Sequence, residues 1–197
     1  FYMSNKGIDL LINYKNMLER NILSMEHFPE IRDIEEIGLT LIENSFIKSK
    51  TVNQITGLPC LADDTGLEVD ALNGAPGVFS ARFAGGNPTY DDNVRKLLHE
   101  LKNTPENLRT ARFRTVISYV DSKNEFYDEG TIEGRITLEP SGLDGFGYDP
   151  VFIPNNFDKT FAEMPKEIKN KISHRALALN KMKKRLKIYF MKGEAIR

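Results

Sequence analysis

The spacing of apolar residues along the chain switches between a helical and an extended period. Apolar side chains three or four positions apart predict four helices, over residues 8–23, about 41–56, 90–102 and 172–193. Start signals support these bounds, because Thr40 and Glu43 form a capping-box pattern and Thr89 and Ser173 precede the third and fourth helices. Gly57 follows the second helix, as expected at a helix C-terminus.

Strand patterns alternate with these helices. Strands are predicted at residues 58–63, 111–121 and 125–137, and at the end of the segment 139–154. Glycines and prolines mark a long irregular loop over 65–88 and a second one early in 139–154. Because helices and strands are mixed and no repeat or linker divides the chain, we predict an α/β fold in one domain, residues 1–197.

The composition narrows the class of protein. The 27 basic and 28 acidic residues leave a formal net charge of -1, which argues against bulk nucleic acid or a membrane surface as partner. The basic residues between Lys181 and Lys187 are interpreted as a solvated helix face. No apolar run is long enough to span a bilayer. Cys60 is the only cysteine and lies in an apolar run, so we expect a buried thiol in a soluble, cytoplasmic protein.

Two adjacent carboxylates, Asp63 and Asp64, stand where the strand over 58–63 is expected to end in a turn. Such a turn can direct both side chains into one cleft, and paired carboxylates need a compensating cation. Mg²⁺ takes one or two carboxylates and completes its coordination with water and phosphate oxygens. The alternative is structural, with Asp63 capping a turn at Gly66 and Asp64 in solvent.

The second glycine-rich loop lacks the spacing and the strand-loop-helix context of a dinucleotide-binding fingerprint. Its glycines, Gly145 and Gly147 among them, allow sharp bends around two aromatic residues, Phe146 and Tyr148. These rings are suited to stacking on a base, and the alternative is that both are core residues beneath a turn.

His174 and Arg175 follow Ser173 at the predicted start of the last helix. Amide donors, the helix dipole and a guanidinium would together attract an anion or a carbonyl oxygen. A His-Arg pair by itself is more often an ordinary surface feature.

Taken together, these segments resemble one family, the inosine triphosphate pyrophosphatases, over residues of about 35–179. The resemblance rests on the stretches EEIGLTLIENSFIKSK, LPCLADDTGLEVDALNGAPGVFSARFAGG, GFGYDPVFIP and TFAEMPKEIKNKISHRALAL, and more loosely on SNKG. It implies a two-lobed α/β domain with a long central mixed sheet flanked by helices and an active-site cleft between the lobes. It also implies a Mg²⁺-dependent, cytoplasmic homodimer.

The resemblance implies roles for two groups of residues. Asp64 matches the general base, Asp63 and Glu36 match supporting metal ligands, Lys48 matches a phosphate-side lysine and Thr65 matches a substrate-contacting hydroxyl. A second group surrounds the purine and distinguishes a 6-keto from a 6-amino group. It comprises the stacking loop of Phe146, Gly147, Tyr148 and Asp149, and also Lys169, His174 and Arg175.

One segment departs from the family pattern. The family has a phosphate-binding loop of the type Thr-Gly-Asn-x-x-Lys, and here the corresponding residues run from Met3 to Ile8. Ser4 and Asn5 keep their roles in this alignment, whereas the expected lysine is replaced by Ile8. Either Lys6 substitutes for it or the triphosphate is held more weakly.

The predicted function is therefore hydrolysis of non-canonical purine nucleoside triphosphates, such as ITP, dITP and XTP, to the monophosphate and pyrophosphate. Two alternatives remain. An aspartate-based phosphatase would need a second aspartate at the position of Thr65. A nucleotide-binding module that has lost turnover would bind ITP without releasing product.

Overall fold

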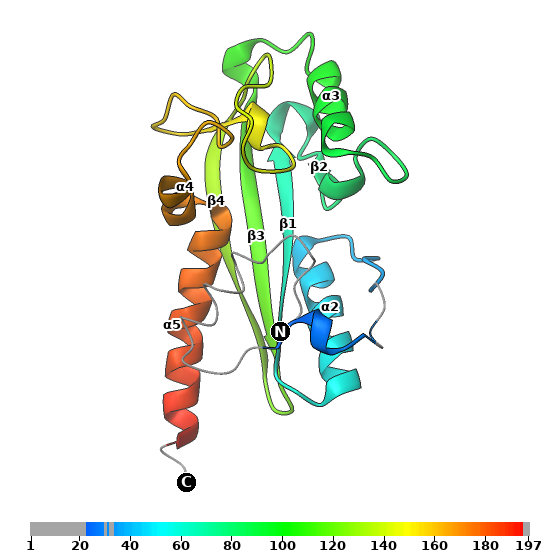
Figure 1. Cartoon of the computed structure of the whole chain (residues 1–197), viewed down its shortest axis with the longest axis vertical. Helices are drawn as coiled ribbons and strands as arrows, with labels where there is room; N and C mark the ends of the chain where they lie inside the picture. Colours follow the sequence, from blue (N-terminus) through cyan, green and yellow to red (C-terminus); the bar gives the residue numbers. More distant parts are fainter. Residues whose placement is uncertain (1–22, 30, 32–33, 195–197) are drawn as a thin grey trace. The chain divides into compact units, whose positions relative to one another are not determined.

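The computed structural model describes residues 23–29, 31 and 34–194 (Figure 1). The helices and strands are α2 (Leu41–Thr56), β1 (Cys60–Val69), β2 (Pro76–Gly77), α3 (Tyr90–Glu100), β3 (Thr110–Val120), β4 (Glu125–Ile136), β5 (Phe152–Pro154), α4 (Lys166–Ile172) and α5 (His174–Glu194). Short 3-10 turns lie at Met25–His27, Asp70–Leu72, Ser80–Arg82, Glu106–Leu108 and Asp149–Val151. The second and third predicted helices and the predicted pair of strands are confirmed. The first predicted helix falls, apart from Leu23, outside the described residues.

Five strands form one sheet in the order β2-β1-β3-β4-β5 (Figure 1). β1 pairs antiparallel with β2, with Leu67 opposite Gly77, and β4 pairs antiparallel with β5, with Gly134 opposite Pro154. Consecutive strands joined by a short turn, such as β3 and β4, also pair antiparallel. The α/β class is confirmed, and the sheet formed by the described strands is antiparallel instead of mixed.

The length of β1 corrects one expectation. The strand was expected to end at residue 63 in a turn, but it continues through Asp63, Asp64 and Gly66 to Val69. Asp64 and Gly66 are buried, Asp63 and Thr65 are half-buried, and after Gly66 the buried positions change to Leu67 and Val69. The two aspartates therefore lie inside a strand and not at its tip, and Asp63 does not cap a turn at Gly66.

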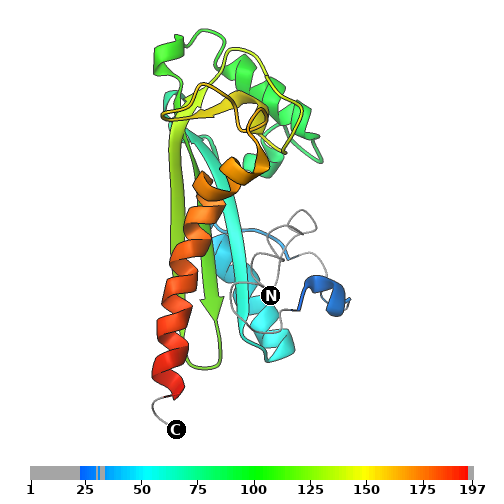
Figure 2. The ribbon, with the colours of Figure 1, turned by 60° about the vertical axis from the view of Figure 1, so that its left-hand side comes forward.

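The chain divides into two compact units, of which the first comprises Phe1–Asp64, Val116–Glu129 and Ala178–Arg197. In this unit Cys60 packs with Val52 of α2, whereas its neighbour Leu61 packs with Met182 and Leu186 of α5. Adjacent strand residues point to opposite faces, so α2 and α5 cover opposite faces of this part of the sheet (Figure 2).

The second unit comprises Thr65–Thr115 and Gly130–Leu177. Its core joins α3 and the sheet through Leu67, Val69, Val94, Leu97, Leu101, Phe113, Ile136, Phe152 and Phe161. The neighbouring positions on the strands are polar, and Arg112 forms ion pairs with Asp70 (2.8 Å) and Glu133 (3.1 Å). One face of the sheet is thus packed and the other carries paired charges, as is common in antiparallel sheets.

A break at Ser173 separates the last two helices. The sequence predicted one helix from residue 172, but α4 ends at Ile172 and α5 begins at His174. Ser173 has an extended backbone, and its Oγ accepts a hydrogen bond from the backbone N–H of Ala176, so its predicted role as the cap of α5 is confirmed. None of the helices described here is long and apolar enough to cross a membrane.

Candidate active site

Helix α2 faces the sheet of the first unit largely with small polar side chains. Its buried positions, three or four residues apart, are Leu41, Asn44, Ser45, Lys48, Ser49 and Val52. The Ser45 hydroxyl lies within hydrogen-bond distance of the Ala62 carbonyl (2.9 Å) and the Ser118 hydroxyl (2.8 Å), which Ser49 also contacts. Small side chains with satisfied hydroxyls let the helix approach the sheet closely. The next turn of this face carries Lys48 toward β1.

Lys48 is the centre of the first candidate cluster. Its Nζ donates hydrogen bonds to Asp64 Oδ1 at 2.8 Å and to Glu36 Oε1 at 2.9 Å. Lys48 is only 4% exposed and Asp64 only 8% exposed, so both charges are largely withdrawn from water. Among the described residues Lys48 is the only hydrogen-bond partner of the Asp64 carboxylate, and its contact is to Oδ1. The structure thus brings together three of the residues that the resemblance implied.

The electrostatics of this cluster favour a base that works near neutral pH. Burial raises the pKa of Asp64 to about 6, against the lowering effect of Lys48, and the charges of Glu36 and Asp63 add to the increase. Burial alone would lower the pKa of Lys48, but the three carboxylates raise it, so the ammonium stays charged. A carboxylate with a pKa near 6 is ionised at pH 7 and still basic enough to accept a proton.

Asp63 and Thr65 occupy the alternate positions of β1, on the opposite face from Asp64. The Thr65 hydroxyl lies 2.7 Å from that of Thr115, which is buried on β3. Asp63 is close enough to influence the pKa values of both Lys48 and Asp64. The two aspartate side chains therefore leave the strand in different directions and do not enter one cleft as expected. Asp63 acts on Asp64 and Lys48 through its charge.

The carboxylates of this cluster fit a divalent cation in chemistry and charge. The charges of Glu36, Asp63 and Asp64 all act on the Lys48 ammonium, which pairs directly with Glu36 and Asp64. Over residues 23–29, 31 and 34–194, no three acidic, histidine or cysteine side chains converge closely enough to hold a metal by themselves. Mg²⁺ does not need such a set, because it commonly uses one or two carboxylates and fills its remaining positions with water and substrate phosphates.

The loop around Phe146 forms a second cluster, in the second unit. Asp149 is buried, and its Oδ2 accepts hydrogen bonds from the Phe146 backbone N–H at 2.7 Å and from Lys169 Nζ. Gly145 has a φ of +84°, and a Cβ there would meet Asp149 Oδ2 at 2.3 Å. A glycine is thus required where the loop turns over the carboxylate, which explains one of the glycines that the sequence singled out.

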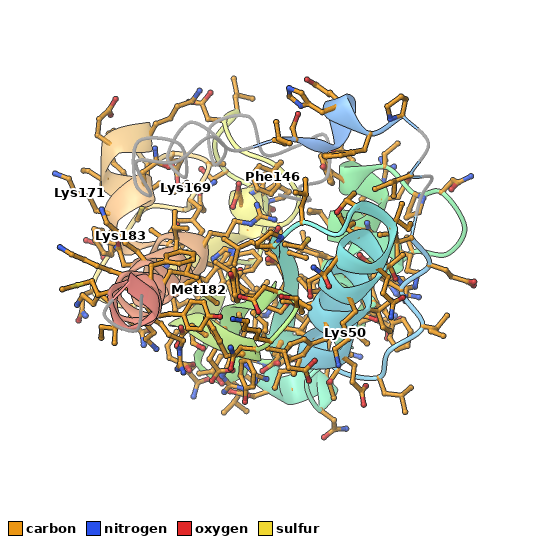
Figure 3. All side chains as sticks on the ribbon, turned by 90° about the horizontal axis from the view of Figure 1, so that it is seen from below. Lys50, Phe146, Lys169, Lys171, Met182 and Lys183 are labelled. Atoms are coloured by element: carbon orange, nitrogen blue, oxygen red, sulfur yellow. The ribbon has the colours of Figure 1, made fainter. Side chains whose placement is uncertain are left out.

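Two cations lie near the ring of Phe146, a residue that is 39% exposed. Lys169 Nζ lies 5.2 Å and Arg175 Cζ 4.9 Å from the ring centroid. Figure 3 shows Phe146 and Lys169 with their side chains close together. The Tyr90 ring, at the start of α3, lies 6.4 Å away at an angle of 45°. An accessible aromatic face bordered by fixed donors is suited to a planar ligand with carbonyl oxygens.

Tyr148 and His174 are core residues to a greater extent than the sequence suggested. The Tyr148 hydroxyl donates to the Ser80 carbonyl at 2.9 Å, and burial raises the pKa of this phenol. Stacking on a ligand is therefore left to Phe146. The His174 ring stacks on Phe113 at 4.6 Å, and burial lowers the pKa of His174 well below its usual value, so the imidazole is neutral. Its buried Nδ1 has no hydrogen-bond partner among the described residues.

Some of the predicted site residues lie outside the part of the chain that the structure describes, and two residues near the clusters were not predicted from the sequence. Ser4, Asn5, Lys6 and Ile8 fall outside the described residues. Gly147 has a φ of +63° and open space at its Cβ position. The sequence reasoning missed Asn44 and Tyr90. Tyr90 directly follows the cap Thr89. For Asn44 the sequence carried a usable signal, because TLIEN and TYDDN share a cap followed four residues later by an asparagine.

The fold and the two clusters define an α/β protein with nucleotide-binding features, and comparisons with known proteins identify its family. The model of the Ham1 family matches residues 9–185. The chain therefore belongs to the Ham1 family, which confirms the resemblance seen in the sequence.

Curated relatives and solved structures agree with this assignment. The chain is 51% identical over 162 residues, 82% of each chain, to the dITP/XTP pyrophosphatase of Thermoanaerobacter pseudethanolicus. It is 53% identical over 151 residues, 77% of each chain, to that of Porphyromonas gingivalis. The Staphylococcus aureus Ham1 protein matches with a TM-score of 0.87 at 37% identity, covering 98% of this chain and 97% of its own. A Mycobacterium abscessus protein described as a nucleoside-triphosphatase / dITP/XTP pyrophosphatase matches with a TM-score of 0.79 at 35% identity, covering 92% and 96%.

Proposed function

We propose that this protein hydrolyses non-canonical purine nucleoside triphosphates, of the ITP, dITP and XTP type, to the monophosphate and pyrophosphate. The observation that carries the proposal is the state of Asp64. It is a buried carboxylate with a pKa near 6, fixed through Oδ1 by Lys48, and its Oδ2 accepts no hydrogen bond from the described residues. The names of the relatives supply the substrate class.

In the proposed mechanism Asp64 orients a water molecule and accepts its proton at Oδ2 as the oxygen attacks the α-phosphorus. A bond forms between the water oxygen and the α-phosphorus, and the bond from the α-phosphorus to the bridging oxygen breaks. Pyrophosphate leaves with that oxygen and the electron pair. The Lys48 ammonium holds Asp64 in place and offsets negative charge on the phosphates.

We propose that Glu36 and Asp64 hold Mg²⁺ and that Asp63, on the opposite face of β1, adds negative charge nearby. When bound, the ion would neutralise phosphate charge and lower the pKa of bound water.

For recognition of the base we propose that Phe146 stacks on the purine, while Lys169 and Arg175 donate hydrogen bonds to keto oxygens. A 6-amino group would place a donor against these donors, so ATP should be rejected. Thr65, Gly147, Asp149 and His174 are assigned to substrate binding on the family resemblance, together with Ser4, Asn5 and Lys6. For Tyr148, whose ring is buried, only the backbone is available to the ligand.

Family membership also supports a cytoplasmic homodimer as a proposal. Sedimentation velocity of the purified protein tests the oligomeric state, and a species with the mass of one chain would contradict it.

A substrate panel tests the proposed function directly. Pyrophosphate release is measured with ITP, XTP, dITP, GTP and ATP, each with and without Mg²⁺. We expect release from the first three, in the presence of Mg²⁺ only. Orthophosphate as the first product would instead indicate a phosphatase, and calorimetric binding of ITP without turnover would indicate a binding module.

A further inference from the structure

Asn44 is a buried side chain that the mechanism above does not use. It stands four residues after the N-cap Thr40 and is fully buried. Its Oδ1 accepts a hydrogen bond from the backbone N–H of Gly38 at 2.7 Å. The contact is tight, because a Cβ at Gly38 would meet Asn44 Oδ1 at 2.6 Å and Glu43 Cβ at 2.8 Å. The segment that precedes α2 is therefore held against the first turn of the helix.

Glu43 extends this attachment to the next two residues. Its Oε2 accepts hydrogen bonds from the backbone N–H groups of Leu39 (2.7 Å) and Thr40 (3.0 Å). Three successive backbone donors, at residues 38–40, are thus bound by the side chains of Asn44 and Glu43. Glu36 lies just before this segment, so its carboxylate is carried by backbone that the helix fixes.

Helix α3 begins in the same way and provides an internal comparison. Thr89 and Asp92 form its capping box, and Asn93 occupies the position that corresponds to Asn44. Asn93 Oδ1 accepts from the Ala84 N–H at 2.7 Å, and its Nδ2 donates to the Ala81 carbonyl at 3.1 Å. Both polar atoms of Asn93 are therefore satisfied, as expected for a purely structural asparagine.

Asn44 differs from Asn93 in the hydrogen bonding of its amide nitrogen, Nδ2. Its Nδ2 is buried and has no hydrogen-bond partner among the described residues. The assignment of oxygen and nitrogen follows from the Gly38 contact, because the reverse assignment would place two donors against each other. An unsatisfied buried donor carries a desolvation cost, so the contact with Gly38 is the only one that satisfies the Asn44 amide among the described residues.

We propose that Asn44 is a positioning residue for Glu36. The same face of α2 holds Asn44 and, four residues later, Lys48, so one rigid helix fixes the Glu36 segment at one end and its ammonium partner at the other. The result is the contact of 2.9 Å between Lys48 Nζ and Glu36 Oε1. Only the kinetic part of the test rests on the proposed function.

The first test uses the metal-free protein and needs no substrate. Asn44→Ala should raise amide hydrogen exchange at Gly38 by about tenfold or more, because the hydrogen bond that protects it is lost. In protein with ¹⁵N-labelled lysine, the Lys48 ammonium signal should broaden as its Glu36 partner becomes mobile. Asn93→Ala is the matched control and should leave both signals unchanged. A folded Asn44→Ala protein with unaltered Gly38 exchange and an unaltered Lys48 signal would overturn the proposal.

The second test separates positioning from general destabilisation. Asn44→Ala should lower kcat/KM for ITP by about ten- to a hundredfold, the cost of misplacing a catalytic group by about 1 Å, while Asn93→Ala should change it by less than about threefold. In a Glu36→Gln background, Asn44→Ala should cost much less, since the group that it positions has already been neutralised. Additive losses would overturn the proposal.

Gly38→Ala disturbs the same contact from the other side and gives an independent variant if Asn44→Ala does not fold. It should reproduce the altered Lys48 signal. A wild-type protein that releases no pyrophosphate from ITP would refute the proposed function, whereas the metal-free measurements would still decide the role of Asn44.

Discussion

Each of the two units contains a largely buried lysine paired with a buried aspartate, and the surroundings of the two pairs differ. Lys48 and Asp64 lie among further carboxylates, with Glu36 2.9 Å from the ammonium. Lys169 and Asp149 lie among aromatic rings, with the centroids of Phe146 and Phe161 5.2 and 5.4 Å from the ammonium. The first pair thus lies beside further carboxylates, and the second lies beside aromatic rings.

The two aspartates also differ in the hydrogen bonds that they accept. Asp149 Oδ2 accepts from both Lys169 and the Phe146 backbone, so this carboxylate organises a loop. Asp64 is held through Oδ1 alone, and burial raises its pKa to about 6. An ion pair therefore does not reveal a catalytic carboxylate by itself. The informative feature of Asp64 is the pKa that burial raises.

The largest effect is expected from Asp64→Asn. The amide keeps the shape of the side chain but cannot accept a proton, so kcat should fall by about a hundred- to ten-thousandfold with little change in ITP binding. Steady-state kinetics and calorimetry measure the two quantities. Asp149→Asn should instead raise KM more than it lowers kcat. A loss of less than about tenfold in Asp64→Asn would place the base elsewhere, with Asp63 the next candidate.

The pH profile of kcat/KM should show an acid limb set by Asp64. Burial raises the pKa of this carboxyl to about 6, so the basic form is lost as the pH falls through that value. Below it, kcat/KM should fall about tenfold per pH unit. His174 should add no limb in this range, because burial lowers its pKa well below the usual value and keeps it neutral. A limb near pH 4 would mean that the reacting base is an exposed carboxylate.

A smaller effect, on binding instead of turnover, is expected at Phe146, beside Lys169 of the second unit. Phe146→Ala removes the exposed ring over which Lys169 and Arg175 lie. Stacking on a base is worth about 1–3 kcal/mol, which corresponds to about a five- to hundredfold loss of ITP affinity in calorimetry. Tyr148→Phe is a suitable control, since it alters only the core hydrogen bond to Ser80. Unchanged affinity in Phe146→Ala would mean that the ring only packs within the protein.

The sequence predicted those parts of the molecule that local patterns determine. The capping box of α2 and the alternation of β3 and β4 are local signals, and both elements were found. The full length of β1 was missed, because Asp-Asp-Thr-Gly has low strand propensity and is kept extended by pairing with β3, shown by the contact between Thr65 and Thr115. Pairing of this kind depends on residues fifty positions away.

The sequence also predicted part of the candidate site. The aspartate pair and the Phe146 loop were visible as unusual residue combinations. The placement of Lys48 came only from the family resemblance, since a lysine within a helix is usually solvent-exposed. The sequence left the core position of Tyr148 open as one of two alternatives and did not indicate the unsatisfied Nδ2 of Asn44, because both depend on packing between segments distant in the sequence.

The smallest effects are expected at the capping boxes that begin α2 and α3. Loss of an N-cap hydroxyl costs about 0.5–2 kcal/mol of unfolding free energy, so Thr40→Ala and Thr89→Ala should destabilise the protein by similar amounts, measured by urea denaturation.

The two variants should nevertheless differ in activity, and this difference sharpens the comparison between the two regions. Thr40 and Glu43 anchor the backbone that leads to Glu36 and the Lys48 cluster, whereas Thr89 and Asp92 begin a helix that carries neither lysine. Thr40→Ala should therefore lower kcat/KM by several-fold more than Thr89→Ala at equal loss of stability. In Thr89→Ala the readout is local instead. The hydrogen bond from the Thr89 hydroxyl is the first of the causes that lower the pKa of Asp92 to about 2, so its loss should raise this pKa in an NMR titration. Equal activities in two equally destabilised variants would show that the start of α2 supports only the fold, and the catalytic importance of the Glu36 segment would then have to be abandoned.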